Sequence, residues 1–440
     1  MKQVLVLGAG LVARPLVRYL LEDPDFQVTV ATRTVSKADE LIAGHPHGVS
    51  KKVDVSDETA LRELIATADI VISLLPWIHH LTVANLCVEY GKNMVTTSYV
   101  KPEMQALDGQ VREKGLIFLN EIGVDPGIDH MAAMRVINGV KNAGGKITSF
   151  YSYCGGLPAL QDNTNPWGYK FSWSPVGVML AAKNSGRYLK NGAVVDVAPE
   201  QLFEHYWLLD VPGSGTFEAY VNRDSLPYVD LYGVQGIESM YRGTLRNVSH
   251  CESWNYFKKL GLFDQERTFD FGTTAPRQVL AALVDSNGDD LVADMARFLG
   301  IAPYAVAIKK LQWLGLFSDE LLPLGVASVF DMFAHVMEKR LVYAPGEVDL
   351  LAQHHEFIAE YPDGRREFIT STMVDTGIPH GDSSMARTVS LPAAIATKMI
   401  LKGIIDLKGV VIPVHPEIYN PVLDELETMD IRLVERKRDL

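Results

Sequence analysis

Residues 4–15 read VLVLGAGLVARP, an apolar run that breaks at a glycine-rich turn and resumes with helical spacing. Gly8, Gly10 and Ala13 form the pattern Gly-x-Gly-x-x-Ala. Gly8 permits a tight turn after a strand, Gly10 lets a pyrophosphate approach the backbone, and Ala13 allows a helix to pack closely on the strand. The helix N-terminus adds positive potential. The stretch predicts a dinucleotide site; the alternative is a similar fold that has lost its ligand.

Short apolar strands and helical segments alternate from this stretch to about residue 120. Buried strands separated by helices are typical of a doubly wound α/β fold with a parallel sheet. The expected strands are Val4–Leu7, Val28–Thr32, Val53–Val55, Ile70–Leu75, Asn93–Thr97 and Ile117–Asn120. The expected helices are Val12–Leu21, Lys37–Gly44, Ala60–Thr67 and Leu81–Tyr90.

The alternation stops near Glu121–Asp129, and a strand-like run follows at Ser149–Tyr153. Pro362-Asp363-Gly364 separates two alternating runs and predicts a hairpin of Asp349–Tyr361 with Arg365–Met373. A last helix is expected from Ser390-Leu391-Pro392 to Leu401, with Pro392 in its first turn. The middle of the chain is mostly helical, with expected helices at Arg277–Val284, Asp289–Phe298, Tyr304–Leu314 and Leu324–Lys339.

Composition narrows the class of protein. The 440 residues carry a formal net charge of −13, which disfavours nucleic acid and anionic membranes as partners. Three widely spaced cysteines form no disulfide framework, which favours a reducing compartment. No signal peptide and no apolar run of membrane-spanning length is recognisable. We therefore expect a cytoplasmic protein that acts on small molecules.

The end of the second expected strand selects the nucleotide. An acid there would bind the ribose 2′-hydroxyl of NAD, but this chain has Thr32-Arg33-Thr34. A guanidinium between two hydroxyls suits a 2′-phosphate, so the sequence favours NADP(H); a solvated loop arginine is the alternative. Val53-Asp54 follows at the next strand tip, where an adenine ring would lie.

Polar residues also follow the later strands. Thr96-Thr97-Ser98-Tyr99 closes the fifth strand, where hydroxyls either face a ligand or cap a turn. His79 and His80 stand at a helix start and are interpreted as surface or capping groups. No other His or Cys spacing suggests a metal, and none is expected. The loop Asn120–His130 holds three acids and a histidine, and it would carry Asp125 to the nicotinamide or serve as a domain hinge.

Two further regions suggest a substrate pocket. Cys154–Pro158 and Tyr169–Pro175 combine flexible backbone with polar and aromatic side chains, as pocket walls do. Asn222–Asp224 and Tyr241–Arg246 together bring three arginines. Arginine forks bind carboxylates in a bidentate manner, which points to a substrate with several carboxylates. Surface ion pairs are an equally good interpretation of the spacing.

The motifs GAGLVARP, TTSYV, NEIGVDPGIDH, SYCGGLPA, GYKFSWSP, NRDSLPY and YRGTLR occur in this order up to about residue 250. Together with MARTVSLPAAIA at Met385–Ala396, they resemble the saccharopine reductase family, the NADP-dependent, glutamate-forming saccharopine dehydrogenases. In that family an acid usually follows SYCGGLPA, whereas this chain has Leu160-Gln161 after Ala159.

The resemblance implies a Rossmann domain, an α/β substrate domain on a mostly antiparallel sheet, a helical insertion, and a final segment that returns to the Rossmann domain. The corresponding boundaries are 1–125, 126–253 with 341–390, 254–340 and 391–440. The residues implied to hold NADP(H) are Gly8, Gly10, Leu11, Val12, Ala13, Thr32, Arg33, Thr34, Val53, Asp54, Leu75, Val124, Asp125 and Ser174. Those implied to hold the substrate are Ser98, Tyr99, Cys154, Gly155, Arg223, Thr244, Leu245 and Arg246.

The implied reaction is reduction by NADPH of the imine between L-glutamate and 2-aminoadipate 6-semialdehyde to saccharopine, a reversible step of lysine metabolism and amino-acid biosynthesis. Asp125, Tyr99 and Cys154 are the titratable groups expected near the reacting carbon. Related imine chemistry, as in carboxynorspermidine synthase or lysine 6-dehydrogenase, is an alternative. A nucleotide-sensing protein without catalysis is another. A homodimer is expected from the frequency of symmetric dimers alone.

Overall fold

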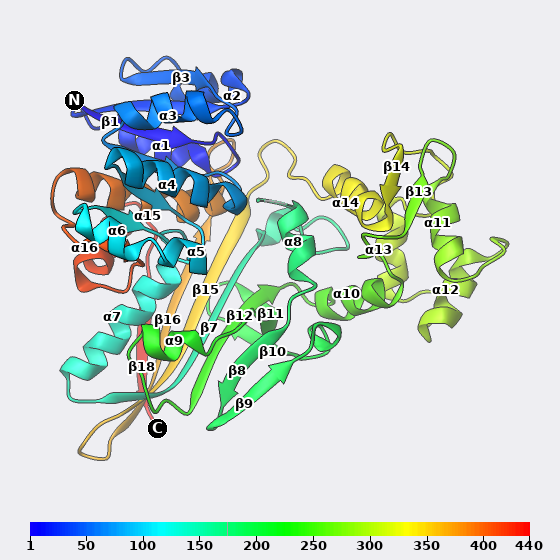
Figure 1. Ribbon diagram of the computed structural model, residues 1–440. Helices are drawn as coiled ribbons and strands as arrows, with labels where there is room; N and C mark the ends of the chain where they lie inside the picture. The colour runs from blue at the N-terminus through cyan, green and yellow to red at the C-terminus, as the bar shows by residue number, and fades with distance from the viewer. Residues whose placement is uncertain (174) are drawn as a thin grey trace. The chain divides into compact units, whose positions relative to one another are not determined.

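A computed structural model describes residues 1–173 and 175–440 of the chain (Figure 1). Its described residues divide into two compact units, each assembled from separate segments of the chain. The first unit comprises Met1–Thr148, Leu231–Val234 and Gln353–Leu440, and the second comprises Ser149–Asp230 and Gln235–Ala352. In the described ranges, no helix combines the length and the apolar character needed to cross a bilayer.

The first unit begins with the predicted alternation of strands and helices. Its N-terminal elements are β1 (Lys2–Leu7), α1 (Ala13–Leu21), β2 (Phe26–Thr32), α2 (Val35–Ile42), β3 (Gly48–Lys52), α3 (Glu58–Thr67), β4 (Ile70–Ser73), the 3₁₀ helix η1 (Trp77–His79), α4 (His80–Tyr90), β5 (Asn93–Thr96), α5 (Pro102–Gln105), α6 (Asp108–Glu113), β6 (Ile117–Leu119) and α7 (Ile128–Asn142). The C-terminal segment adds β16 (Arg366–Thr376), α15 (Ser384–Leu401), β17 (Gly409–Val411), α16 (Pro416–Glu427) and β18 (Val434–Asp439).

A parallel sheet organises this unit. In the described residues it has seven strands in the order β17-β6-β5-β4-β1-β2-β3. All its pairings are parallel, including β1 with β2, β1 with β4, and β17 with β6. The order turns back on itself between β1 and β4, which is the arrangement of a dinucleotide-binding doubly wound fold. The predicted fold class is therefore confirmed.

Both faces of this sheet are covered by helices, and the side-chain pattern explains why. Leu5 and Leu7 of β1 join an apolar cluster with residues of α3, α4 and α6. Val4 and Val6 point to the opposite face, and they too are buried. On that face α15 contacts β4, β5 and α1, whose buried residues recur at helical spacing from Ala13 to Leu21. A strand buried on both sides reads as a continuous apolar run, as VLVL does.

The second unit contains strands, short helices and a mostly helical part. Its elements are the 3₁₀ helix η2 (Leu160–Asp162), α8 (Pro175–Ala181), β8 (Gly186–Lys190), β9 (Ala193–Val197), the 3₁₀ helix η3 (Pro199–Gln201), β10 (Tyr206–Val211), β11 (Gly215–Val221), α9 (Pro227–Leu231), β12 (Ser239–Arg246), α10 (His250–Lys259), β13 (Thr268–Asp270), α11 (Pro276–Leu283), α12 (Leu291–Leu299), α13 (Val306–Leu314), β14 (Val326–Ser328) and α14 (Val329–Arg340).

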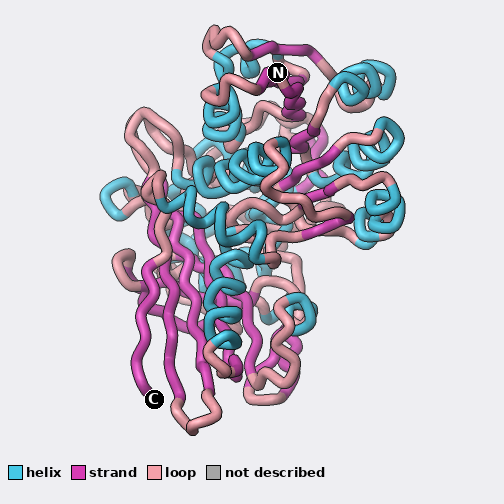
Figure 2. The backbone as a smooth tube through the Cα atoms, turned by 90° about the vertical axis from the view of Figure 1, so that its left-hand side faces the viewer, coloured by secondary structure: helices cyan, strands magenta, loops and turns pink. Residues whose placement is uncertain are grey.

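A mixed sheet carries the remaining strands, among them β7 (Lys146–Pro158) and β15 (Asp349–Glu360). Its main path in the described residues is β10-β11-β12-β7-β15-β16-β18, with β8 and β9 attached at β12. The pairing of β7 with β12 is parallel, whereas β10–β11, β11–β12, β8–β9 and β16–β18 are antiparallel. Figure 2 shows the strand that ends at the C-terminus beside long strands of this sheet.

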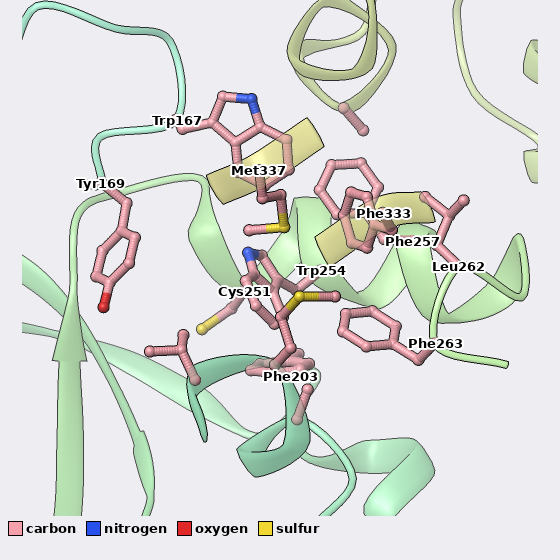
Figure 3. Close-up of a cluster of buried hydrophobic side chains, with 14 of the residues drawn as sticks. Trp167, Tyr169, Phe203, Cys251, Trp254, Phe257, Leu262, Phe263, Phe333 and Met337 are labelled. Carbon is pink, nitrogen blue, oxygen red and sulfur yellow. The ribbon is translucent and has the colours of Figure 1, made fainter. Parts of the chain in front are cut away.

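An aromatic cluster forms the core of the second unit (Figure 3). Phe257 and Phe333 are fully buried, and their ring centroids lie 5.9 Å apart. Trp167 packs on Phe257 at 5.2 Å, and Phe263 packs edge-on against Phe333 at 5.7 Å. These tilted and edge-on contacts are the geometries that aromatic quadrupoles favour. The cluster fixes the helices α10 and α14 against each other.

Two expected elements are wrong in detail. Val53–Val55 is not a strand; β3 precedes it at Gly48–Lys52. This edge strand is half-buried to exposed, so its polar sequence gave no apolar signal. The expected helix Leu324–Lys339 begins only at Val329, because Val326–Ser328 is strand β14 and the Ser328 hydroxyl accepts a capping bond from the Asp331 N–H at 3.0 Å.

The position of Pro392 is also different from the prediction. Helix α15 begins at Ser384, eight residues before Pro392, and holds Pro392 in its interior. It is not the last helix, because α16 follows at Pro416–Glu427. Ser383 is the N-cap and accepts a hydrogen bond from the Ala386 N–H at 3.0 Å. Most residues of this helix are buried, including Ala393 and Ala396. Burial of its apolar surface outweighs the cost of an interior proline. Rules based on local sequence include that cost but not the burial, so they place proline at a helix start.

The aromatic core allows a direct test of this packing. We predict that Phe333→Ala lowers the free energy of unfolding by about 3–5 kcal/mol, because it removes buried area and leaves a cavity. Phe298 of α12 is 51% exposed, and its replacement by Ala is expected to change stability by less than about 0.5 kcal/mol. Denaturant unfolding followed by tryptophan fluorescence measures both. Similar losses for the two variants would contradict this account of the core.

Candidate active site

The carboxyl ends of the parallel strands bring the predicted cofactor residues together in the first unit. The strands β1, β2 and β4 are adjacent and parallel, so the loops that follow them leave the same edge of the sheet. Gly8 begins the loop after β1, Arg33 lies in the loop after β2, and Leu75 follows β4. Ligands of doubly wound sheets bind at this edge, where the strand order reverses.

The glycine turn after β1 has the conformation that the sequence predicts. Gly8 has φ +110°, and its N–H donates to the Ala31 carbonyl at 3.0 Å. A Cβ at Gly8 would lie 3.0 Å from the Leu74 carbonyl oxygen, so neighbouring backbone excludes any side chain. At Gly10, by contrast, a Cβ would meet no described atom within 4 Å. The backbone there is open to a ligand, and the buried Ala13 lets α1 start against the sheet.

The N-terminus of α1 suits a phosphate group. Its N-cap is Val12, and within residues 1–173 and 175–440 no side chain forms a cap hydrogen bond there. Leu11, which precedes Val12, is 69% exposed. An apolar N-cap leaves the first N–H groups of the helix without a side-chain acceptor. The pyrophosphate of a dinucleotide can supply that acceptor, with the helix dipole favouring its charge.

The loops after β2 and β3 form the second part of the predicted cofactor site. Arg33 and Thr34 are exposed, and Thr34 is the N-cap of α2, where the described residues contain no side-chain cap bond. Hydrogen bonds from Ser56 lower the pKa of Asp54, and the positive charges of Arg33 and His79 lower it further. Val53 is buried, and its N–H donates to the Thr32 carbonyl at 3.0 Å.

These features fit NADP. A 2′-phosphate needs cationic and hydroxyl donors and no neighbouring carboxylate directly after the second strand. Arg33 and Thr34 supply such donors, and Thr34 does not use its hydroxyl in a cap. Asp54, which lies within the electrostatic reach of Arg33, accepts its hydrogen bonds from Ser56 at 2.8–3.0 Å. The exposed guanidinium is therefore available to a ligand phosphate.

Two residues predicted to lie near the reacting carbon are in contact. The Tyr99 hydroxyl donates to Asp125 Oδ1 at 3.0 Å, and both residues are half-buried. Tyr99 follows β5, and Asp125 lies in the loop between β6 and α7. Ser98 precedes Tyr99, and Val124, which precedes Asp125, is buried. Tyr99 and Asp125 belong to separate sequence motifs and are 26 positions apart, and the fold brings them into contact.

The sequence interpretation of His80 was wrong. It was expected to be a surface or capping group, but it is only 6% exposed and bridges the ends of β4 and β5. Its Nδ1 lies 2.9 Å from Ser73 Oγ, and its Nε2 lies 2.8 Å from Ser98 Oγ. Burial, with the nearby His79, lowers the pKa of His80 to about 4, so the ring is neutral near pH 7. Its helical spacing with the apolar Val83, Ala84 and Cys87 was the available signal.

A second set of predicted residues lies in the second unit, where β7 and β12 run in parallel. Cys154 is the register partner of Thr244, which directly precedes the buried Leu245. A Cβ at Gly155 would lie 2.6 Å from the Leu245 carbonyl oxygen, so only glycine fits there. Four of the predicted substrate residues therefore occupy adjacent positions on two paired strands.

Arg246 ends β12 and is buried. Its Nη1 donates to the Leu245 carbonyl at 2.8 Å, and its guanidinium carbon lies 5.1 Å from the centroid of the Tyr169 ring. Its Nε has no hydrogen-bond partner in the part of the chain that the structure describes. A buried N–H without a partner is rare in native proteins, and a ligand carboxylate would satisfy it.

Arg223 differs from Arg246 in exposure. It follows β11 in a left-handed conformation with φ +60°, is exposed, and its carbonyl accepts from the Arg187 N–H at 2.9 Å. The strained backbone fixes where this side chain leaves the loop. Ser174, the remaining predicted cofactor residue, lies outside the described residues.

Sequence reasoning missed the groups that fix the chain just after Arg246. Glu218 is buried and accepts from the N–H groups of Ser249 and Cys251, each at 2.7 Å. Lys310 of α13 donates to the Ser249 carbonyl at 2.8 Å, and burial lowers its pKa to about 8. Both residues lie far along the sequence from the segment that they fix, so no local pattern connected them with it. The structure contains no described group of three or more His, Cys, Asp or Glu side chains placed to hold a metal ion.

A doubly wound sheet with a glycine turn, a helix N-terminus open to phosphate and a basic loop after β2 defines the class of NADP-binding oxidoreductases. The saccharopine dehydrogenase NADP binding domain matches residues 4–119, and the saccharopine dehydrogenase C-terminal domain matches residues 123–431. The chain therefore belongs to the saccharopine dehydrogenase family.

Named relatives cover the whole chain. It is 38% identical to saccharopine dehydrogenase [NADP(+), L-glutamate-forming] of Schizosaccharomyces pombe, over 99% of each chain. Identity to the Saccharomyces cerevisiae protein of that name is 40% over 97% of each chain. The mitochondrial alpha-aminoadipic semialdehyde synthase of Bos taurus is 37% identical, and the match covers 98% of this chain and 47% of that longer protein. The solved apo saccharopine dehydrogenase (L-Glu forming) of S. cerevisiae superposes with a TM-score of 0.91 at 37% identity, covering 100% of both chains.

The environment of His80 predicts a pH dependence of stability. In the folded protein its pKa is about 4, whereas an unfolded histidine titrates near 6.5. The unfolded chain therefore binds more protons between these values, and stability falls as the pH drops through this window. From pH 7 to about pH 4.5, the unmodified protein should lose about 2 kcal/mol more than His80→Gln, which cannot titrate. The measurement is the free energy of unfolding from denaturant titrations at each pH. If it falls equally with pH in the unmodified protein and in His80→Gln, the burial of a neutral ring is contradicted.

The loop after β2 predicts the cofactor preference. Arg33→Asp should weaken NADPH binding by about 10- to 100-fold, because it removes charge-assisted hydrogen bonds and adds repulsion. NADH binding should improve, since a carboxylate there accepts from a ribose 2′-hydroxyl. Lys37→Asp on α2 makes the same charge change nearby and should have a much smaller effect. Fluorescence titration measures all four affinities; equal effects of the two variants would point to the general field of the protein instead of Arg33.

Proposed function

We propose that this chain catalyses the reversible NADPH-dependent reduction of the imine formed from L-glutamate and 2-aminoadipate 6-semialdehyde, giving saccharopine. The observation that carries the proposal is the full-length match to relatives named for this L-glutamate-forming, NADP(+)-dependent activity. The buried, partly unsatisfied Arg246 and the Tyr99–Asp125 contact are consistent with it. Saccharopine has three carboxylates, and an arginine-bearing site suits such a substrate.

The cofactor and the residues divide the chemistry between them. Bound NADPH supplies the hydride and its two electrons to the imine carbon, and the imine nitrogen takes up one proton. We propose that Gly8, Gly10 and Leu11 to Ala13 hold the pyrophosphate, and that Thr32 to Thr34 hold the 2′-phosphate. Val53, Asp54, Leu75, Val124, Asp125 and Ser174 complete the proposed cofactor site.

Proton transfer during formation of the imine is the chemistry that the protein side chains must provide. A C–N bond forms when the neutral glutamate amine attacks the aldehyde carbon, and the C=O π bond breaks onto oxygen. The nitrogen then loses both amine protons, and the carbinolamine oxygen, after taking up two protons, departs as water to leave the imine. Tyr99 and Asp125 share a hydrogen bond of 3.0 Å and can hold a proton for such steps, and Cys154 is the third titratable group proposed there. Tyr99 is expected to orient the Asp125 carboxyl group.

Substrate carboxylates are assigned to the two arginines. Arg246 is buried over an aromatic ring with one N–H unsatisfied, which prepares it for a carboxylate. The exposed Arg223 is proposed to bind a second carboxylate. Ser98, Tyr99, Cys154, Gly155, Thr244 and Leu245 are the remaining residues of the proposed substrate site.

The cellular setting belongs to the same proposal. Lysine metabolism is the pathway class that consumes and forms saccharopine, and a cytoplasmic location suits a chain with few cysteines. We propose a homodimer on the general frequency of two-fold assemblies. The functional division proposed along the chain is 1–125 for NADP, 126–253 with 341–390 for substrate, 254–340 as the insertion, and 391–440 as the returning segment.

A panel of amines tests the proposal. The semialdehyde and NADPH are offered with glutamate, lysine, diaminopropane or putrescine, and NADPH oxidation is followed by absorbance. Turnover is expected with glutamate, and Arg246→Met should lower kcat/KM for glutamate by about 10- to 100-fold through the lost carboxylate pair. Arg267→Met, at a surface arginine of the second unit, is the control.

The alternatives predict different outcomes. Carboxynorspermidine synthase activity would appear as turnover with a diamine. Lysine 6-dehydrogenase activity would appear as oxidation of lysine with reduction of NADP+. Both would show little dependence on Arg246. NADPH binding without turnover of any pair would support a nucleotide sensor. Either result contradicts the proposed substrate and leaves the family and the cofactor standing.

A further inference from the structure

A buried carboxylate at the start of the Asp125 loop contacts the loop that carries Tyr99. Glu121 is 6% exposed, and both of its carboxylate oxygens are engaged. Oε1 accepts from the Val100 N–H at 2.9 Å, and Oε2 lies 2.8 Å from His130 Nε2. The Glu121 backbone is left-handed, with φ +57°, a conformation that is strained for this residue type.

His130 extends this chain of hydrogen bonds. It is fully buried, and its Nδ1 lies 2.6 Å from the Tyr232 hydroxyl. Tyr232 is 2% exposed and belongs to the short segment Leu231–Val234 of the same compact unit. The three side chains therefore form one continuous line, Val100 N–H to Glu121 to His130 to Tyr232, that is shielded from water.

The line joins the two loops at defined points. Val100 directly follows Tyr99, and the Glu121 N–H donates to the Ser98 carbonyl at 3.1 Å. Glu121 and His130 bracket the loop that holds Asp125, and inside it the Gly123 N–H donates to the Pro126 carbonyl at 2.9 Å. The separation of Tyr99 from Asp125 is thus fixed by bonds on both sides of their own contact.

A role in stability alone is a weak explanation for this arrangement. Burying a carboxylate is costly, and apolar residues of similar volume stabilise a core as well or better. A buried polar line is useful when it selects one arrangement of its partners, because the alternatives leave unpaired groups in a low dielectric. Here the selected arrangement is that of the two proposed catalytic side chains.

We propose that Glu121, His130 and Tyr232 form a positioning clamp for the proposed reaction, holding Tyr99 and Asp125 at hydrogen-bond distance. The inference rests on the proposed function for its catalytic consequence. None of the three clamp residues transfers a proton to the substrate; they act through the two loops. Geometry, and not the charge of Glu121, is what the clamp requires.

This requirement makes the conservative variant informative. In Glu121→Gln the amide oxygen can still accept from the Val100 N–H. The amide N–H₂ can donate to His130 Nε2, with His130 Nδ1–H then donating to the Tyr232 oxygen. Glu121→Ala removes the hydrogen bonds to the Val100 N–H and to His130, and Tyr232→Phe removes only the hydroxyl that contacts His130. The matched control is Tyr361→Phe, which deletes a tyrosine hydroxyl bonded to Glu367 at 2.8 Å in the same unit.

Steady-state kinetics with glutamate, the semialdehyde and NADPH, together with NADPH titration, test the clamp. We expect kcat to fall about 100-fold in Glu121→Ala, because misplacement by about an ångström has effects of that size. The loss should be about threefold to tenfold in Tyr232→Phe and below about fivefold in Glu121→Gln, with NADPH affinity within about twofold throughout. Tyr361→Phe should match the unmodified protein.

A double-variant cycle separates positioning from general damage. Asp125→Asn alone should lower kcat, but added to Glu121→Ala it should lower kcat little further, because Asp125 is already displaced. The pH–rate profile of Glu121→Ala should resemble that of Asp125→Asn. Full kcat in Glu121→Ala, or additive losses accompanied by matching losses of NADPH affinity, would overturn the clamp.

Hydrogen exchange gives a readout that does not depend on turnover. The Val100 amide should exchange at least about tenfold faster in Glu121→Ala than in Glu121→Gln or the unmodified protein, since its buried acceptor is lost. Equal exchange rates in all three would overturn the clamp, whatever the kinetics show. If the unmodified protein fails to turn over glutamate and the semialdehyde while the exchange difference appears, the proposed function fails and the clamp between the two loops stands.

Discussion

The parallel pairing of β1 with β2 on one side and β4 on the other is the constraint on which the site depends. Because the three strands point the same way, the chain leaves the sheet at one edge three times. Two backbone bonds continue the pairing beyond the strands, from Gly8 N–H to the Ala31 carbonyl and from Leu74 N–H to the Leu7 carbonyl. The glycine turn, the Arg33 loop and the segment leading to His80 are therefore held at fixed spacing before any ligand is present.

Buried hydrogen-bonded groups then set the side chains that the sheet only brings near one another. His80 links Ser73 at the end of β4 to Ser98 after β5. Glu121 fixes the loops of Tyr99 and Asp125, and Glu218 with Lys310 fixes the turn after Arg246. Each is largely removed from water, so an alternative arrangement would leave a donor or acceptor unpaired. Both compact units follow the same rule: apolar packing forms the fold, and a few satisfied polar groups select one geometry at the functional edge.

The sequence predicted those parts of the structure that depend on local pattern. Gly8, Gly10 and Ala13 act through backbone conformation and size, so their spacing was sufficient. Arg33 and the hydroxyls after the fifth strand were proposed because strand ends identify the ligand edge, and the structure places Arg33 after β2 and Ser98 after β5. The hairpin around Pro362-Asp363-Gly364 was predicted for the same local reason, and its turn closes with the Tyr361 N–H donating to the Arg365 carbonyl at 2.9 Å.

What the sequence did not predict depends on contacts between distant residues. His130 and Tyr232 are 102 positions apart, and Lys310 is 61 positions from Ser249. No periodicity connects such residues, so Glu218 and Lys310 received no structural role. The helix around Pro392 was predicted to its correct end at Leu401 but with too late a start, for the opposite reason: the local rule against interior proline is sound, and burial of the whole helix outweighs it.

The proposed role of Arg246 reconciles the acidity of the protein with a polyanionic substrate. The net charge of −13 would repel such a molecule at long range, but the field near a buried group is set by its immediate neighbours. Arg246 lies over an aromatic ring and donates to a backbone carbonyl, and its Nε remains unsatisfied among the described residues. The cost of desolvating this guanidinium is already included in the stability of the fold. A carboxylate that reaches it therefore meets a donor that needs no further dehydration or ordering, which is the physical meaning of a preorganised anion site.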